Sequence, residues 1–147
     1  MMAFEDFPLG HRFTTSTVTL TEEAIIAFAQ ANDPQPFHLD AEAAKESPYG
    51  GIIASGFQTM IEAFKLTLAE GGWADASMGS PGMEEVRWIL PVRPGDTLHV
   101  EAEVLKSTAS RSKPDRGFTV IRYDVLNQAG ERVMSYTSTH MLRRRAA

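Results

Sequence analysis

An aspartate and a histidine lie five residues apart in the segment NDPQPFHLD, at Asp33 and His38. Two prolines, Pro34 and Pro36, lie between them. Each proline fixes its own φ and biases the preceding residue toward extended backbone, so Asp33 and His38 cannot lie one turn apart on a helix. A bent, rigid segment of this kind could aim both side chains at one water, as general acid–base catalysis near neutral pH requires. The alternative is that Asp33 caps the preceding helix and His38 is an ordinary surface histidine.

The composition is that of a soluble globular protein. With 147 residues, 43% of them hydrophobic and 22% charged, the chain is expected to form a single domain over residues 1–147 with its own core. The absence of cysteine excludes disulfides and thiolate metal sites and fits a reducing compartment, so we expect a cytoplasmic location. The four histidines show no metal-ligand spacing, and we expect no metal and no separate cofactor.

The charge and the termini exclude further classes of function. A net charge of −5 argues against a nucleic-acid partner, and the basic run at residues 143–145 is best explained as a solvated tail. The N-terminal segment is acidic and lacks the basic and apolar regions of a signal peptide. No apolar stretch approaches the roughly 20 residues that a membrane-spanning helix needs, so no membrane partner is expected.

The first half of the chain is predicted to contain one strand and several helices. Residues 12–20 are rich in β-branched residues and predict a strand. Thr21 is a suitable N-cap for a helix that runs to about Ala31, and Pro34 prevents its continuation. Residues 41–46 predict a short polar helix after Asp40. The strongest helix covers residues 55–70 and is ended by two glycines.

The long helix and the segments that follow it predict the architecture. Its apolar stripe is expected to belong to the core and consists of Phe57, Met60, Ile61, Phe64 and Leu68. Alternating residues predict antiparallel strands near 84–92, 98–104, 118–126 and 131–142, with a hairpin turn at 127–130 and a mobile loop at 107–117. Because so wide a stripe needs a sheet to cover it, we expect an α+β fold with a curved antiparallel sheet wrapped around this helix.

This element order and three motifs resemble the hot-dog fold and, more narrowly, the MaoC-like dehydratases and (R)-specific enoyl-CoA hydratases. The motifs are FAQANDPQPFHLD at 28–40, GIIASGF at 51–57 and LPVRPGDTL at 90–98. The first resembles the catalytic segment of the family and is specific, whereas the third is a marker of the fold only. The resemblance covers nearly the whole chain, from residue 4 to the last predicted strand.

The resemblance implies a reaction and roles for individual residues. The reaction is the reversible hydration of a trans-2-enoyl thioester, such as an enoyl-CoA, to a 3-hydroxyacyl thioester. Asp33 and His38 fall on the two residues that activate water. Gly56 falls on the residue whose amide binds the thioester oxygen, an interaction that can contribute ~3 kcal/mol to the transition state. Without the resemblance, Gly56 is equally a glycine that permits a tight helix entry. Ser55, Phe57 and Phe37 are expected to contact the substrate.

The resemblance also implies a homodimer or higher homo-oligomer with the acyl site at the subunit interface, since paired sheet edges would complete both the sheet and the pocket. The coenzyme A phosphates have three cationic candidates with no reason to prefer one, namely Arg87, Arg93 and Lys113.

The chain departs from the family pattern at three positions. Gln35 stands where the family often has asparagine, and Ser55 stands where hydratases commonly have histidine. The position of a helix serine that hydrogen-bonds the catalytic aspartate in some members matches Phe64 here. Asp33 would then lack one orienting partner, or take Thr59 or Gln58 in its place.

Two other functions stay open at this point. An acyl-CoA thioesterase on the same fold would need an acid on the long helix, where the candidates are Glu62, expected to face solvent, and Glu70. A non-catalytic acyl-thioester-binding subunit that needs a second hot-dog chain would explain the departures at Ser55 and Phe64.

Overall fold

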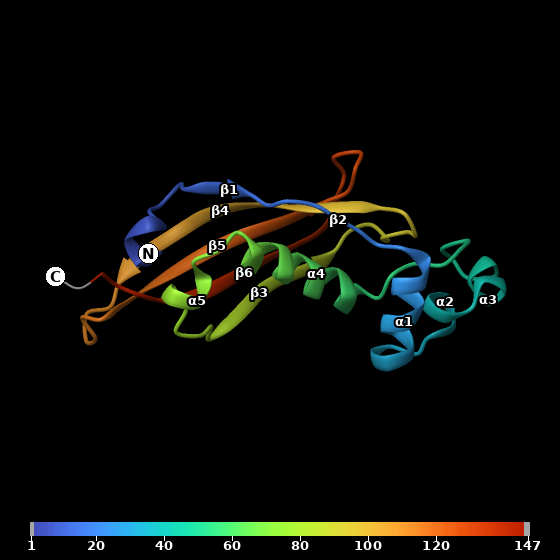
Figure 1. The fold of residues 1–147 in the computed structure, drawn as a ribbon, viewed down its shortest axis with the longest axis horizontal. Coiled ribbons are helices and arrows are strands. Elements are labelled where there is room, and N and C mark those ends of the chain that lie inside the picture. Colours follow the sequence, from blue (N-terminus) through green and yellow to red (C-terminus); the bar gives the residue numbers. More distant parts are fainter. Residues whose placement is uncertain (1, 146–147) are drawn as a thin grey trace.

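A computed structural model describes residues 2–145 as an antiparallel sheet with helices on one face and at one end (Figure 1). The sheet order is β1-β4-β5-β6-β3, and β2 also pairs with β4. The strands are β1 (Arg12–Thr14), β2 (Val18–Thr19), β3 (Gly82–Trp88), β4 (Thr97–Ala109), β5 (Arg116–Leu126) and β6 (Arg132–Arg143). The expected α+β architecture is confirmed.

The long helix α4 lies along the sheet, and three shorter helices gather beyond its amino end (Figure 1). The helices are α1 (Glu22–Asn32), α2 (Pro36–Leu39), α3 (Ala41–Lys45), α4 (Gly56–Ala69) and α5 (Trp73–Ala76), with a 3-10 turn at Phe4–Asp6. Thr21 caps α1 by accepting the Ala24 N–H, and Asp40 caps α3, as predicted. After α4 the chain turns through Gly71 and Gly72, which have φ of 89° and 81°, a region that favours glycine. None of the helices in the described part of the chain is long and apolar enough to cross a bilayer.

Some boundaries differ from the prediction. The first strand is interrupted between β1 and β2, where the Thr15 hydroxyl accepts the Val100 N–H instead of continuing the ladder. The expected mobile loop at 107–117 is wrong, because β4 and β5 continue to pair as far as Ala109 opposite Gly117. Only residues 110–115 remain between these two strands. The hairpin turn between β5 and β6 is confirmed, since the Gly130 N–H donates to the Asn127 carbonyl.

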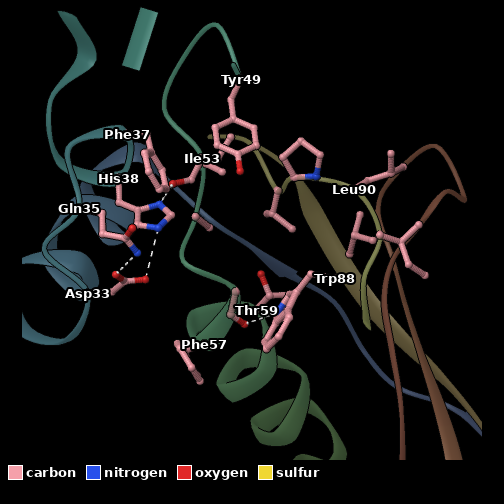
Figure 2. A pocket seen from close by; sticks show the side chains of 16 residues that line it. Asp33, Gln35, Phe37, His38, Tyr49, Ile53, Phe57, Thr59, Trp88 and Leu90 are labelled. Atoms are coloured by element: carbon pink, nitrogen blue, oxygen red, sulfur yellow. Dashed lines mark hydrogen bonds and ion pairs between the residues drawn. The ribbon is translucent and has the colours of Figure 1, made fainter. Parts of the chain in front are cut away.

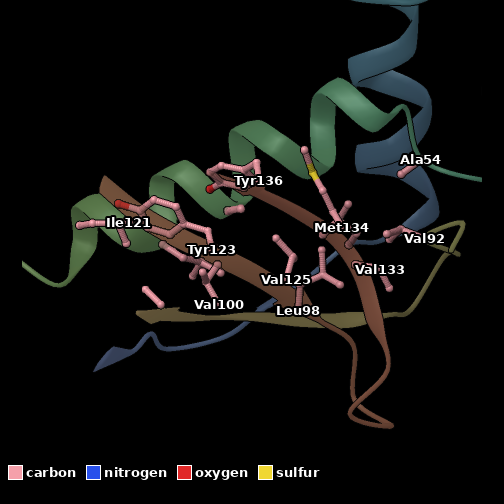
Figure 3. Packing of buried hydrophobic residues seen from close by; sticks show 14 of the residues in the cluster. Ala54, Val92, Leu98, Val100, Ile121, Tyr123, Val125, Val133, Met134 and Tyr136 are labelled. Carbon is pink, nitrogen blue, oxygen red and sulfur yellow. The ribbon is translucent and has the colours of Figure 1, made fainter. Parts of the chain in front are cut away.

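The core lies between α4 and the inner face of the sheet (Figure 3). Strands β4, β5 and β6 contribute most of it, through alternating residues such as Val100, Ile121, Val125 and Met134, each almost fully buried. Burying this apolar surface stabilises the sheet–helix packing at roughly 25 cal/mol per Å². The sheet therefore presents α4 with a continuous apolar platform.

Most of the apolar stripe of α4 is not part of this core, which corrects the sequence-based expectation, whereas its member Met60 is partly buried and packs against the core. Phe57, Ile61, Phe64 and Leu68 are between 44% and 61% exposed. The face of α4 that packs on the sheet carries one large apolar residue, Leu66, beside smaller or polar ones, which are Gln58, Thr59, Ala63 and Thr67. Small side chains allow the helix backbone to lie close to the sheet, and the bulky residues then point away from it. The helix is amphipathic, as its periodicity predicts, but the face that the pattern assigns to the core is largely exposed.

Candidate active site

The segment between α1 and α2 brings Asp33 and His38 together because its prolines break the helix twice. Asp33 follows the last residue of α1, and its N–H still donates to the Ala29 carbonyl. Pro36 occupies the first position of the single-turn helix α2, where the missing N–H of proline costs nothing. His38 projects from this turn back toward Asp33. The two residues therefore come from different helices, as the prolines predict.

The imidazole of His38 lies between a backbone carbonyl and the Asp33 carboxylate (Figure 2). Its Nδ1 is 2.7 Å from the carbonyl oxygen of Ile53, and its Nε2 is 3.3 Å from Oδ2 of Asp33. Because a carbonyl can only accept, Nδ1 carries the hydrogen and Nε2 is the basic nitrogen of the neutral ring. His38 is 4% exposed, so this tautomer is fixed inside the protein. A basic nitrogen beside a carboxylate can accept both hydrogens of one water.

The Asp33 carboxylate receives two further hydrogen bonds. The Gln35 side-chain amide donates to Oδ1 at 2.7 Å, and the Ser55 hydroxyl donates to Oδ2 at 2.7 Å. Burial opposes ionisation and is the largest single influence on this group. The bonds from Gln35 and Ser55 and the nearby His38 together outweigh it and lower the pKa of Asp33 below its ordinary value. Asp33 is therefore an oriented anion at neutral pH.

Ser55 supplies the orienting hydroxyl that the sequence appeared to lack at Phe64. It is fully buried, caps α4 by accepting the Phe57 N–H at 3.2 Å, and does not line the cavity in front of Asp33. The expectation that Ser55 contacts substrate is therefore not supported. The predicted substitutes Thr59 and Gln58 do not orient Asp33. Its carboxylate accepts from Gln35 and Ser55 instead, and Gln58 donates to the Ala24 carbonyl at 3.3 Å. The signal for the true role was in the sequence, since serine before a helix is a typical N-cap.

Asp33 and His38 open onto a cavity of about 380 Å³ (Figure 2). The predicted substrate contacts Phe37 and Phe57 both line it, as do two residues that the sequence did not single out, Tyr49 and Trp88. The rings of Phe37 and Tyr49 lie 5.4 Å apart on one side, and those of Phe57 and Trp88 lie 5.8 Å apart on the other. The mostly apolar wall suits a ligand group with little charge.

Gly56 also lines the cavity, at the amino end of α4. Its N–H has no hydrogen-bond acceptor among residues 2–145, as expected for the first residue of a helix. Its carbonyl accepts the Trp88 indole N–H at 2.9 Å, and a Cβ added here would lie 2.6 Å from Cε2 of that ring. Glycine is thus required for close packing against Trp88, and the same packing leaves an unpaired amide in the cavity wall. The tight helix entry is thus observed, and the role of this amide toward a thioester oxygen stays a prediction.

The other candidates lie elsewhere. Arg93 directly follows the cavity-lining residue Val92, whereas Arg87 lies in a hollow on the outer face of the sheet. Lys113 lies in the β4–β5 turn, at the far end of the molecule from α1 (Figure 1). Of the candidate acids, Glu62 is 19% exposed and pairs with Lys65 at 3.4 Å, so it does not simply face solvent as expected.

Neither Glu62 nor Glu70 lines the cavity of Asp33. Within residues 2–145, no group of three or more His, Cys, Asp or Glu side chains is placed to hold a metal ion.

Comparison with known proteins identifies the family. The sequence profile of the MaoC like domain matches residues 6–124, which include Asp33, His38 and Gly56. This chain belongs to the MaoC-like family. A MaoC-like dehydratase from Rhodospirillum rubrum superimposes with a TM-score of 0.91 over 100% of both chains at 42% identity. The (R)-hydratase PhaJ1 from Pseudomonas aeruginosa gives a TM-score of 0.72 over 97% of this chain and 86% of its own, at 25% identity.

The fold of this MaoC-like protein is therefore the hot-dog fold, as the resemblance implied. Along the sequence it is 32% identical to the uncharacterized protein YdeM of Bacillus subtilis, over 97% of this chain and 100% of that protein. It spans only 32% of the length of protein MaoC from Klebsiella aerogenes and 18% of the length of mesaconyl-CoA hydratase from Cereibacter sphaeroides. The similar proteins of known structure include a dehydratase and an (R)-hydratase.

Proposed function

We propose that this protein is a hydratase that interconverts trans-2-enoyl thioesters, with coenzyme A as the favoured carrier, and 3-hydroxyacyl thioesters. The observation that carries the proposal is the convergence of Asp33 Oδ2 and His38 Nε2, 3.3 Å apart, at the wall of a cavity. The (R)-hydratase and dehydratase names of the structural neighbours, and the mesaconyl-CoA hydratase among the relatives, support the same reaction class.

The proposed hydration begins with a water that donates one hydrogen to Asp33 and the other to Nε2 of His38. As the water oxygen attacks C3 of the enoyl group, Nε2 takes its proton, and the imidazolium is stabilised by the adjacent carboxylate. The C2–C3 double bond becomes a single bond, and its electrons move toward the thioester oxygen. The proton then passes from the Asp33–His38 pair to C2. Water has been added across the double bond, and both side chains return to their starting protonation states.

The developing negative charge on the thioester oxygen needs a donor that is already in place. The Gly56 N–H is unpaired and lies at the positive end of the 14-residue helix α4. Since Ser55 links the same helix end to Asp33, the donor and the base are held by one structural unit. No acid of α4 reaches this cavity, so the geometry does not favour a thioesterase mechanism that depends on Glu62 or Glu70.

The exposed stripe of α4 supports a homodimer. Phe57, Ile61, Phe64 and Leu68 lie on the same side of α4, and β3 occupies a free edge of the sheet with Met83 and Trp88 also exposed. An apolar face beside an unpaired strand edge is a hazard for a monomer and a natural interface for a second copy. A two-fold pairing would cover the stripe and bring partner residues to the cavity, in which Phe57 and Trp88 are already present.

The proposal is tested by an assay of crotonyl-CoA hydration, in which the loss of the enone absorbance reports the reaction. Asp33→Asn and His38→Ala should each lower kcat by at least ~100-fold, the usual contribution of acid–base catalysis, without changing the circular dichroism spectrum. His99→Ala, at a partly exposed position of β4, is the matched control and should keep full activity. Turnover retained in either site variant would refute the assignment. Release of free thiol would indicate a thioesterase, and binding without consumption would indicate a non-catalytic subunit.

A further inference from the structure

A second cavity, of about 470 Å³, lies farther along the same helix. Its apolar lining comes from α4 and from strand β3, in particular Met60, Phe64 and Met83. The first cavity is bounded by the preceding turn of α4, at Phe57, and by the other end of β3, at Trp88. The two cavities therefore lie in sequence along the seam between α4 and β3. An extended ligand bound at the first could continue into the second.

The inner wall of the second cavity carries four polar side chains from β5 and β6: Tyr123, Tyr136, Ser138 and His140. The first three are 2%, 5% and 6% exposed, so they are buried within the protein. Figure 3 shows the two tyrosines next to each other beneath the carboxyl half of α4, and their rings stack at 5.0 Å. Polar groups are thus concentrated at one wall of a mostly apolar cavity, whose other polar lining residues are Thr67, Ser77 and Ser80.

These groups have more hydrogen-bond donors than partners. The Tyr123 hydroxyl lies 2.7 Å from Nε2 of His140. Burial lowers the pKa of His140 to about 4 and raises that of Tyr123, so both are neutral at pH 7. If Tyr123 donates, His140 has its hydrogen on Nδ1, and if His140 donates from Nε2, the Tyr123 hydroxyl hydrogen is free. In either tautomer one donor of the pair has no partner within residues 2–145.

The hydroxyls of Tyr136 and Ser138 are also without a hydrogen-bond partner in the described part of the chain. These donors face the open space of the cavity, where water can accept from them, and a ligand that displaces this water without supplying an acceptor would forfeit roughly 1–3 kcal/mol for each donor. A purely apolar ligand would leave all three unsatisfied. A charged group would lose its hydration without meeting an opposite charge, because each of these four side chains is neutral at pH 7. The chemistry fits a neutral oxygen.

We propose that this cavity binds the distal end of an acyl chain that carries a carbonyl or hydroxyl oxygen, so that the protein prefers oxygenated medium-chain acyl thioesters to purely aliphatic ones. The inference rests on the proposed function, since the thioester end would lie at Gly56. Phe64 lies eight residues farther along α4, about 12 Å at 1.5 Å per residue, which places the oxygen roughly nine or ten carbons from the thioester.

Isothermal titration calorimetry with saturated thioesters tests the preference without requiring catalysis. The probes are decanoyl-CoA, 9-oxodecanoyl-CoA and, as a chain too short to reach the second cavity, butyryl-CoA. The wild-type protein should bind 9-oxodecanoyl-CoA roughly five- to tenfold more tightly than decanoyl-CoA, the effect of one or two neutral hydrogen bonds. Equal affinities would overturn the inference, because they would mean that ordered water satisfies the donors equally well.

Two variants assign the preference to the cavity wall. Tyr136→Phe/Ser138→Ala removes two hydroxyls and keeps the Tyr123–His140 pair, and His140→Phe removes the imidazole. In at least one of these variants the ratio of the affinities for 9-oxodecanoyl-CoA and decanoyl-CoA should fall toward one, and the affinity for butyryl-CoA should not change. Ser135→Ala, on the outer face of β6, is the matched control and should keep the preference.

A preference that survives in both wall variants would contradict the inference. Failure of all three thioesters to bind would instead count against the proposed function as a whole, so the two proposals can be refuted separately.

Discussion

The hydroxyl of Ser55 donates to Oδ2 of Asp33 at 2.7 Å, and the Ser55 hydroxyl oxygen accepts a hydrogen bond from the N–H of Phe57 at 3.2 Å. One buried atom therefore joins the carboxylate of the candidate site to the first turn of α4. The N–H of Gly56 belongs to that turn, so the position of the proposed oxyanion donor and that of the proposed base depend on each other. The relationship explains how the chain tolerates Phe64 where a serine is expected.

We expect Ser55→Ala to lower kcat by roughly tenfold and to raise the pKa of Asp33, because the anion loses one of its hydrogen bonds. Since the pKa of Asp33 lies below its ordinary value in the native site, the acid limb of the pH–rate profile should move upward in the variant. Stability should also fall by about 1 kcal/mol through the lost helix cap. Thr21→Ala removes the equivalent cap of α1 and should lower stability without moving the profile. An unchanged acid limb in Ser55→Ala would contradict the role assigned to Ser55.

Gly56→Ala should be destabilising because the added methyl group would lie 2.6 Å from Cε2 of Trp88. Overpacking of this kind typically costs about 1–3 kcal/mol, and displacement of the indole would also disturb the cavity. In Gly56→Ala/Trp88→Ala the clash is absent, so the cost of the alanine should largely disappear. Urea denaturation of the two single variants and the double variant measures this coupling as a double-mutant cycle. Additive effects would show that Trp88 does not constrain Gly56.

The exposed stripe of α4 predicts a variant that dissociates without unfolding. Leu68 is 44% exposed and lines neither of the two cavities, so Leu68→Asp should place a charge in the proposed subunit interface without changing the cavity lining within its own chain. Sedimentation velocity should report a dimer for the wild-type protein and a shift toward monomer for the variant. Leu105→Asp, at a similarly exposed position on β4, should leave the dimer unchanged. If the wild-type protein is a monomer, the exposed stripe of α4 is not a homodimer interface.

The partly buried imidazole of His140 predicts how stability depends on pH. Its pKa is about 4 in the folded protein against 6.5 in the unfolded chain, so between these values the unfolded state binds more protons. Stability should therefore rise with pH from about 4 to 6.5 and fall on acidification, by roughly 2 kcal/mol between pH 6.5 and 5. Denaturation at both pH values should show this dependence in the wild-type protein and a smaller one in His140→Phe. Identical dependences would mean that His140 titrates normally.

Local sequence was sufficient to predict much of the candidate site. The two prolines lie between Asp33 and His38 and prevent one continuous helix there, and the resulting bend places His38 beside Asp33, because proline acts on its own φ and on its immediate neighbour. The caps at Thr21 and Asp40 are likewise local and are confirmed, and the long helix predicted over residues 55–70 is found at Gly56–Ala69. The resemblance to the hot-dog fold, now confirmed, rests on the same short motifs.

Contacts between distant segments were decided only by the tertiary structure. The bond from Ser55 to Asp33 spans 22 residues, the packing of Trp88 on Gly56 spans 32, and neither has a periodic signal. The amphipathic pattern of α4 showed that one face is apolar, but a pattern cannot distinguish the core of one chain from a surface that a second chain covers. The sheet packs against the smaller side chains of α4 because they allow the closer approach, which leaves Phe57, Ile61 and Phe64 on the outside.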